Sequence, residues 1–89
     1  MNSQTTDKFR LLLAAAAPDR QSPNRNAYRL WRDNPAHPSL RFKKVHPRLP
    51  IYSARVDLDW RALGVLESKT MIWFWFGPHR EYEALLKTF

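Results

Sequence analysis

The chain has 89 residues and no cysteine, so we expect a single domain that neither disulfides nor thiolate-bound metals stabilise. Its core must be small, and the 13% of aromatic residues supplies bulky side chains for it. The formal net charge of +7 indicates an acidic partner: nucleic acid, an anionic membrane surface or an acidic protein. No apolar run reaches about 18 residues, the length that a transmembrane helix needs, so we expect no membrane span.

The first residues could be taken for a signal peptide, because Lys8 and Arg10 precede an apolar run over 11–17. That run is only seven residues long, and Asp7 lies in the segment that should be basic. The stripe of an amphipathic helix, spaced i, i+3, i+4, i+7, is formed by Phe9, Leu12, Leu13 and Ala16. We therefore expect a helix in a cytoplasmic protein.

Two helices are predicted in the N-terminal half. Thr5 or Thr6 can cap the first helix, which ends at Pro18. The second helix begins at Ser22–Pro23, as N-cap and first helical residue, and ends at Asn34–Pro35. We expect the two helices to be antiparallel and joined by a short loop.

The C-terminal half is predicted to form strands. Four prolines within 35–50 indicate a connection with one short extended piece over 40–45. The apolar spacing then changes from about 3.6 to about 2 residues. Three strands are expected over 51–56, 60–66 and 71–76, with turns at 57–59 and 67–69.

The third of these strands is apolar on both faces, so it should be a central strand that is covered on both sides. Gly77–Pro78 ends it, and a last helix follows over about 80–87. The order of elements predicts an α+β domain, in which two N-terminal helices pack on one face of a three-strand antiparallel meander.

Cations gather on and before the meander. They are Arg41, Lys43, Lys44, His46, Arg48, Arg55 and Arg61. Strand alternation turns Arg55 away from the apolar face, and Arg61 follows on the adjacent strand. Two guanidiniums on one face can clamp a phosphate. The alternative is a solvated face on which Asp57 and Asp59 neutralise the arginines.

His79 follows the central strand and can donate or accept a proton near neutral pH. Tyr82 lies three residues later on the same helical face. The alternatives are a histidine at a helix cap and a tyrosine packed in the core. No histidine has the spacing of a metal ligand, and there is no glycine-rich phosphate loop, so we expect neither metal nor cofactor.

Four segments together resemble toxins of the RelE/ParE superfamily, over about residues 8 to 86. They are His37–Lys43 (HPSLRFK), Pro50–Val56 (PIYSARV), Trp60–Gly64 (WRALG) and Trp73–Tyr82 (WFWFGPHREY). The resemblance implies one toxin domain over 1–89, with two helices on a small curved antiparallel sheet. The N-terminal strand that is common in the family is reduced in this sequence to at most Asn2–Thr5, which leaves an edge that an antitoxin could cover.

The resemblance implies a type II toxin that cuts mRNA on the ribosome and so represses translation, without a metal. Arg55 and Arg61 match positions that stabilise the scissile phosphate, and His79 falls where members carry a catalytic arginine or histidine. Tyr82 lies near an aromatic position of the family. We expect RNA binding from the remaining cations, Arg41, Lys43, Lys44, His46 and Arg48.

This sequence departs from the family at two further places: Ser53 replaces a lysine of the first meander strand, and Pro23 predicts a late start of the second helix. The alternatives are a ParE-like inhibitor of DNA gyrase and a non-catalytic nucleic-acid-binding module. His79 favours the ribonuclease, because gyrase inhibition needs no proton-transfer residue. Either toxin implies a hetero-oligomer with an acidic antitoxin that folds around it.

Overall fold

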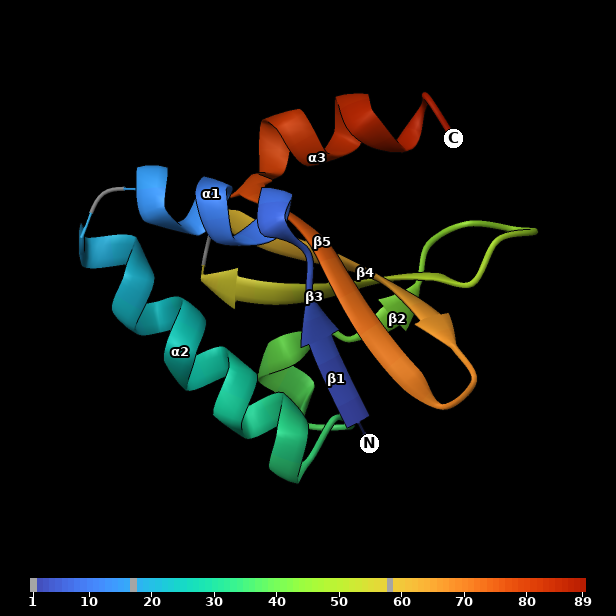
Figure 1. Cartoon of the computed structure of the whole chain (residues 1–89), viewed down its shortest axis with the longest axis horizontal. Coiled ribbons are helices and arrows are strands. Elements are labelled where there is room, and N and C mark those ends of the chain that lie inside the picture. The colour runs from blue at the N-terminus through green and yellow to red at the C-terminus, as the bar shows by residue number, and fades with distance from the viewer. Residues whose placement is uncertain (1, 17, 58) are drawn as a thin grey trace.

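The computed structural model describes residues 2–16, 18–57 and 59–89, and for 18–22 it describes the backbone alone (Figure 1). Its elements in chain order are β1 (Asn2–Thr5), α1 (Asp7–Ala15), α2 (Pro18–Asp33), a 3₁₀ helix (Pro38–Leu40), β2 (Lys43–Lys44), β3 (Ile51–Asp57), β4 (Trp60–Glu67), β5 (Thr70–Pro78) and α3 (His79–Leu86). None of the described helices is long and apolar enough to cross a membrane.

The five strands form one sheet in the order β1-β5-β4-β3-β2. The meander β3-β4-β5 is antiparallel as predicted, but the expectation of a wholly antiparallel sheet is wrong, because β1 pairs with β5 in parallel. The short edge strand over Asn2–Thr5 is confirmed, and it covers Thr70–Trp73 of β5. Thr6 continues this pairing by donating its N–H to the Trp73 carbonyl, and α1 begins directly after it.

The first helix begins as predicted, with the Thr6 hydroxyl accepting from the N–H of Phe9 at 3.1 Å. The predicted start of the second helix is wrong: α2 begins at Pro18, and Pro23 lies inside it. Pro18 takes the first helical position, where a missing N–H costs nothing, whereas Pro23 removes one bond near the start. Ala17 and the side chain of Ser22, the predicted N-cap, lie outside the described residues.

The two N-terminal helices cover one face of the sheet but do not lie along each other. α1 packs mainly against β5 and α2 against β3, and Figure 1 shows them diverging from their connection. The core between them and the sheet consists of Phe9, Trp31, Leu40, Ala54, Ala62, Met71, Trp73 and Phe76. Trp31 and Trp73 meet edge to face at its centre, with ring centroids 5.3 Å apart.

A second, smaller core lies on the other face, where α3 packs. It consists of Ile51, Leu63, Trp75 and Tyr82. A bulge in β5 allows this strand to contribute tryptophans to both cores. Leu63 pairs with Trp75 and Gly64 with Trp73, so Phe74 is the extra residue. Trp73 therefore faces α1 and α2 while Trp75 faces α3, and β5 is covered on both sides as predicted.

The prediction that Gly77–Pro78 ends the last strand is wrong, because both residues still pair with β4. Gly77 lies opposite Arg61, and a Cβ there would lie 2.6 Å from the Trp75 ring. Pro78 has φ −70° and ψ 152°, an extended conformation that suits both a strand end and the N-cap of α3. These two residues therefore join β5 to α3 without a loop.

The β4–β5 turn gives a test of backbone strain. Ser68 and Lys69 have φ of 48° and 68°, the left-handed conformation that a two-residue hairpin needs and that glycine adopts freely. We expect Lys69→Gly to raise the free energy of unfolding by about 0.5–1 kcal/mol, measured by urea denaturation. Lys87→Gly, at an exposed residue with φ −73°, should instead lower it. A loss of stability in both variants would contradict the strain.

Candidate nucleic-acid interface

The pairing of β3 with β4 places two arginines directly opposite each other. Arg55 and Arg61 are Cα partners in the register, so their side chains leave the same face of the sheet. That face is the one under α3, since Ile51 and Leu63 on the same two strands belong to the smaller core. Arg55 and Arg61 thus lie on the side of the sheet away from α1 and α2.

The Arg61 guanidinium is held close to the β3–β4 turn. Its Nη1 donates to the carbonyl oxygens of Trp60 at 3.0 Å and of Asp57 at 3.3 Å. The register shifts here, so that Asp57 rather than Val56 pairs with Trp60. Leu58, the middle residue of the predicted turn, lies outside the described residues. The backbone of the turn therefore orients the second arginine of the pair.

Burial and neighbouring charges both act on the Arg61 guanidinium. Its pKa lies below the ordinary value of a guanidinium, first because partial burial removes water and second because Arg55 carries the same charge. The charge of Arg41 lowers this pKa further, whereas Tyr82 and Asp59 raise it. Arg41, Arg55 and Arg61, which we call the arginine cluster, thus repel one another, and an anion bound between them would relieve the repulsion.

Arg41 reaches this cluster from outside the meander. It caps the 3₁₀ helix in the left-handed conformation, with φ 44° and ψ 40°, which costs energy for a residue other than glycine. The other end of this helix is fixed by His37, whose Nδ1 accepts from the N–H of Ser39 at 3.2 Å. The charge of Asp59 also acts on Arg61, so the anion site and the solvated face balanced by Asp57 and Asp59 both stay predictions.

His79 and Tyr82 stand at the same end of the sheet. His79 is the first residue of α3, and its backbone N–H donates to the Asp59 carbonyl at 2.6 Å. Its ring stacks on Tyr82, with centroids 5.5 Å apart, and its Nε2 lies 3.4 Å from Oε1 of Glu83. Tyr82 is only 7% exposed, so it is a core residue that also orients the imidazole. His79 is not the capping residue, which is Pro78.

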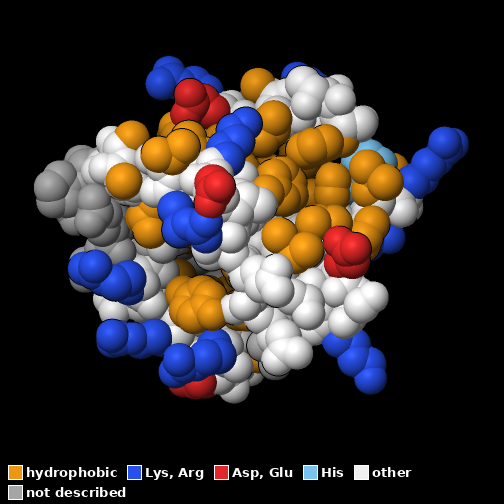
Figure 2. All heavy atoms as spheres, in the orientation of Figure 1, with side chains coloured by type: hydrophobic (Ala, Val, Ile, Leu, Met, Phe, Trp, Pro, Cys, Tyr) orange, Lys and Arg blue, Asp and Glu red, His pale blue; other side chains and the backbone are white. Residues whose placement is uncertain are grey.

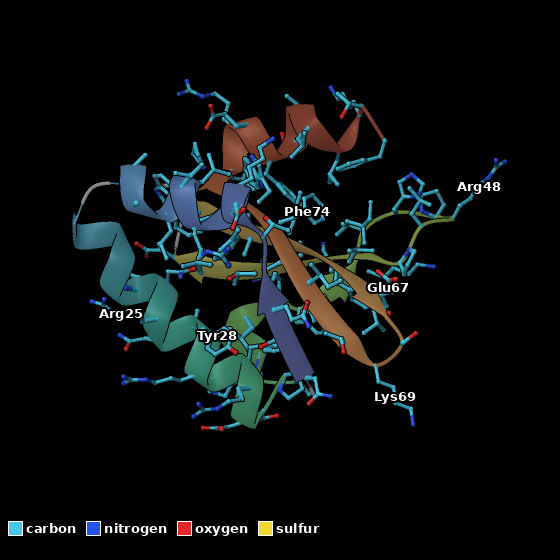
Figure 3. All side chains as sticks on the ribbon, viewed as in Figure 1. Arg25, Tyr28, Arg48, Glu67, Lys69 and Phe74 are labelled. Atoms are coloured by element: carbon cyan, nitrogen blue, oxygen red, sulfur yellow. The ribbon has the colours of Figure 1, made fainter. Side chains whose placement is uncertain are left out.

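The role of the remaining predicted RNA-binding residues stays a prediction. Lys43 pairs with Ser53 and therefore lies on the same face of the sheet as Arg55, whereas Lys44 faces the other side. The His46 Nδ1 accepts from the N–H of Leu49 at 2.8 Å and so shapes the β2–β3 loop. Arg48 extends from the far tip of that loop (Figure 3).

Glu83 is not among the predicted site residues, although its i+4 spacing to His79 could have indicated it. Asp59 was predicted as a counter-charge of the arginines, and its charge does raise the pKa of Arg61. Its carbonyl also accepts from the N–H of His79 at the start of α3, a contact that no local pattern indicates. Among the described residues, no three histidine or acidic side chains are grouped so that they could hold a metal ion.

Several solved structures share this fold. YafQ from E. coli strain BL21(DE3) has a TM-score of 0.73 and 14% identity, over 91% of this chain and 96% of that one. RelE in the RelB–RelE complex from Methanococcus jannaschii has a TM-score of 0.71 and 11% identity, over 91% of this chain and 95% of that one. The RelE–RelB complex from Pyrococcus horikoshii OT3 has a TM-score of 0.64 and 14% identity, over 88% of this chain and 93% of that one. No curated protein matches the sequence.

The fold therefore defines the class of protein: a small α+β domain with the fold of the YafQ and RelE structures. The sequence identifies the family, because residues 23–84, more than half of the chain, match the model of the ParE-like toxin domain. The chain belongs to the ParE-like toxin family, and with it to the RelE/ParE toxin superfamily. The resemblance found in the sequence is confirmed.

The arginine pair can be tested through stability. Replacing Arg55 by Gln removes one of two like charges that face each other across β3 and β4. We expect the free energy of unfolding to rise by about 0.2–1 kcal/mol at low salt, and the gain to shrink as salt screens the charges. Arg48→Gln changes the net charge equally at an exposed loop tip and serves as the control. An equal gain in both variants would assign the effect to net charge alone.

Proposed function

We propose that this protein is the toxin of a type II toxin–antitoxin system and that it cleaves mRNA on the ribosome. The observation that carries the proposal is the arginine cluster next to His79: the pKa of Arg61 is lowered by partial burial and by the charges of Arg55 and Arg41, and His79 can transfer a proton. Such a site suits a reaction in which negative charge develops on a phosphoryl group.

The proposed chemistry is transfer of the phosphoryl group within the RNA. The 2′-oxygen forms a bond to phosphorus and loses its proton, and the bond from phosphorus to the 5′-oxygen breaks. The products are a 2′,3′-cyclic phosphate and a free 5′-hydroxyl. Arg55 and Arg61 stabilise the charge on the phosphoryl oxygens, and Arg41 adds to the field from the neighbouring turn.

His79 is the proposed general acid for the 5′-oxygen, or the base for the 2′-hydroxyl. Tyr82 holds the imidazole by stacking, and Glu83 lies where it can accept from its Nε2. The need for a 2′-hydroxyl makes the reaction selective for RNA. The site residues on this chain are therefore proposed to work as one unit at one end of the sheet.

The proposed partner is an acidic antitoxin. Relatives with this fold were solved as the complexes DinJ–YafQ and RelB–RelE. A chain with net charge +7 attracts an acidic partner, and opposite charges speed the association. Because mRNA and ribosomes are the proposed targets, we expect the protein to act in the cytoplasm.

The direct test is cleavage of an mRNA on purified ribosomes, with the new 5′ ends mapped. We expect His79→Ala to slow cleavage by about 10²–10⁴-fold, since proton transfer is lost. Arg61→Ala should slow it by about 10²–10³-fold, since charge stabilisation is lost. Lys69→Gln, in the exposed turn between β4 and β5, should leave the rate unchanged.

A substrate control isolates the mechanism: a single 2′-deoxy nucleotide at the cleaved position should abolish the cut there and nowhere else. If the wild type cuts no RNA with or without ribosomes but blocks DNA supercoiling by gyrase, the ParE-like alternative holds. If it does neither yet still binds RNA, the protein is a binding module.

A further inference from the structure

A pocket lies beside β3 at an open edge of the sheet. β2 pairs with β3 only at Tyr52 and Ser53, so no described strand covers the part of β3 that follows. α2 and the 3₁₀ helix both pack against β3, and they leave a pocket with a volume of about 490 Å³. We call it the edge pocket. The polar side chains in its lining are Asn26 of α2, Ser39 of the 3₁₀ helix, and Arg55 and Asp57 of β3.

The backbone of Arg55 faces this open edge. The N–H of Val45 donates to the Ile51 carbonyl at 2.9 Å, so the peptide groups of Ile51 point toward the β2 side of β3. Peptide groups alternate in direction along a strand of an antiparallel pair, and those of Arg55, four residues later, therefore point to the same side. Beyond β2 that side is the edge pocket. Arg55 thus offers one backbone donor and one backbone acceptor to a molecule in the pocket.

The lining of the edge pocket combines apolar walls with a few polar groups, as binding sites for small molecules do. The apolar residues include Pro23 and Leu30 of α2, Leu40 of the 3₁₀ helix and Val56 of β3. Their side chains can contact the flat faces of a nucleobase, whose polar atoms lie on its edges. The volume of the pocket falls within the range of about 300–1,000 Å³ that is typical of such sites. The edge pocket therefore suits a single base with its ribose.

Three hydrogen-bonding groups in the pocket favour adenine among the bases. An asparagine amide can bond to both N6 and N7 of adenine, and Asn26 is exposed in the pocket. The His37 Nδ1 accepts from the N–H of Ser39 at 3.2 Å, so the Ser39 hydroxyl, 2.8 Å from the same nitrogen, donates to it and keeps its lone pairs for an amino group. The Arg55 carbonyl is a third acceptor. Guanine carries an oxygen where adenine carries its amino group, so these acceptors would repel it.

The position of Arg55 connects the edge pocket with the arginine cluster. Arg55 lines the pocket and also lies opposite Arg61 across β3 and β4. Among the described residues that line the pocket, it is the one cation. Figure 2 shows further Lys and Arg side chains over α2, but Arg25, Arg29 and Arg32 of that helix line a separate hollow between α1 and α2. A nucleotide in the edge pocket would therefore direct its phosphate toward Arg55 and the cluster.

We propose that the edge pocket binds an adenine base of the RNA, next to the phosphate that the arginine cluster holds. Asn26, Ser39 and the backbone of Arg55 contact the polar edge of the base, and the Arg55 side chain contacts the phosphate. The proposal deepens the proposed function and rests on it for the class of substrate. It adds a preference for one base, so that the cut falls beside an adenine.

The test measures the binding of mononucleotides to the full-length protein by isothermal titration calorimetry, without ribosomes. We expect adenosine 5′-monophosphate to bind at least about fivefold more tightly than guanosine 5′-monophosphate, since one bidentate contact to a base is worth at least that factor. Purine riboside 5′-monophosphate, which lacks only the amino group, should bind as weakly as the guanosine nucleotide. Asn26→Leu should remove the preference for adenosine over guanosine, because the amide that bonds to N6 and N7 is lost.

The matched control is Asn2→Leu, the same exchange at an exposed residue of β1 on the opposite edge of the sheet, and it should keep the preference for adenosine. Equal affinity of the wild type for the two nucleotides would overturn the proposal, and so would an affinity for adenosine 5′-monophosphate no greater than that for inorganic phosphate. A loss of the preference in both variants would overturn the role of the pocket. Nucleotide binding needs no cleavage, so a protein that keeps the preference but cuts no RNA would refute the ribonuclease alone.

Discussion

The register of β3 on β4 is the constraint on which the site depends. Tyr52, Ala54 and Val56 belong to the core under α1 and α2, so alternation sends Arg55 to the other face. A slip by one residue would exchange the two sets and bury the guanidinium, which the core cannot accommodate. The apolar residues of β3 therefore fix the position of its arginine. The repulsion between Arg55 and Arg61 is tolerated because it is small beside the burial that the same register secures.

The bulge in β5 likewise decides which side chains of that strand face α1 and α2 and which face α3. One extra residue, Phe74, lets Trp73 fill the core below α2 and Trp75 support Tyr82 on the other face. Tyr82 in turn stacks on His79, and Gly77 leaves space for the Trp75 ring. A strand without the bulge would turn Trp75 to the face of Trp73 and leave α3 without its platform. The imidazole is thus positioned by packing on Tyr82, with Glu83 3.4 Å from its Nε2.

Local patterns predict those strands whose own residues alternate between polar and apolar or form an apolar run. The alternation in β3 gave the orientation of Arg55, and the apolar run of β5 gave a strand covered on both sides. The predicted start of α2 is wrong because two prolines, Pro18 and Pro23, both suit a first turn, and only the fold decides between them. The parallel pairing of β1 and the approach of Arg41 to Arg61 join segments far apart in the chain, so no spacing reveals them.

The two faces of the sheet carry different groups, and this difference separates the core from the candidate site. The aromatic core under α1 and α2 includes Trp31 and Trp73, whereas Arg55 and Arg61 leave the opposite face. Arg55 lies between Ala54 and Val56 in the chain, so one strand supplies side chains to both faces. Substitutions on α2 therefore act on the packing against β3, while the two arginines stay opposite each other as long as the register of β3 on β4 holds.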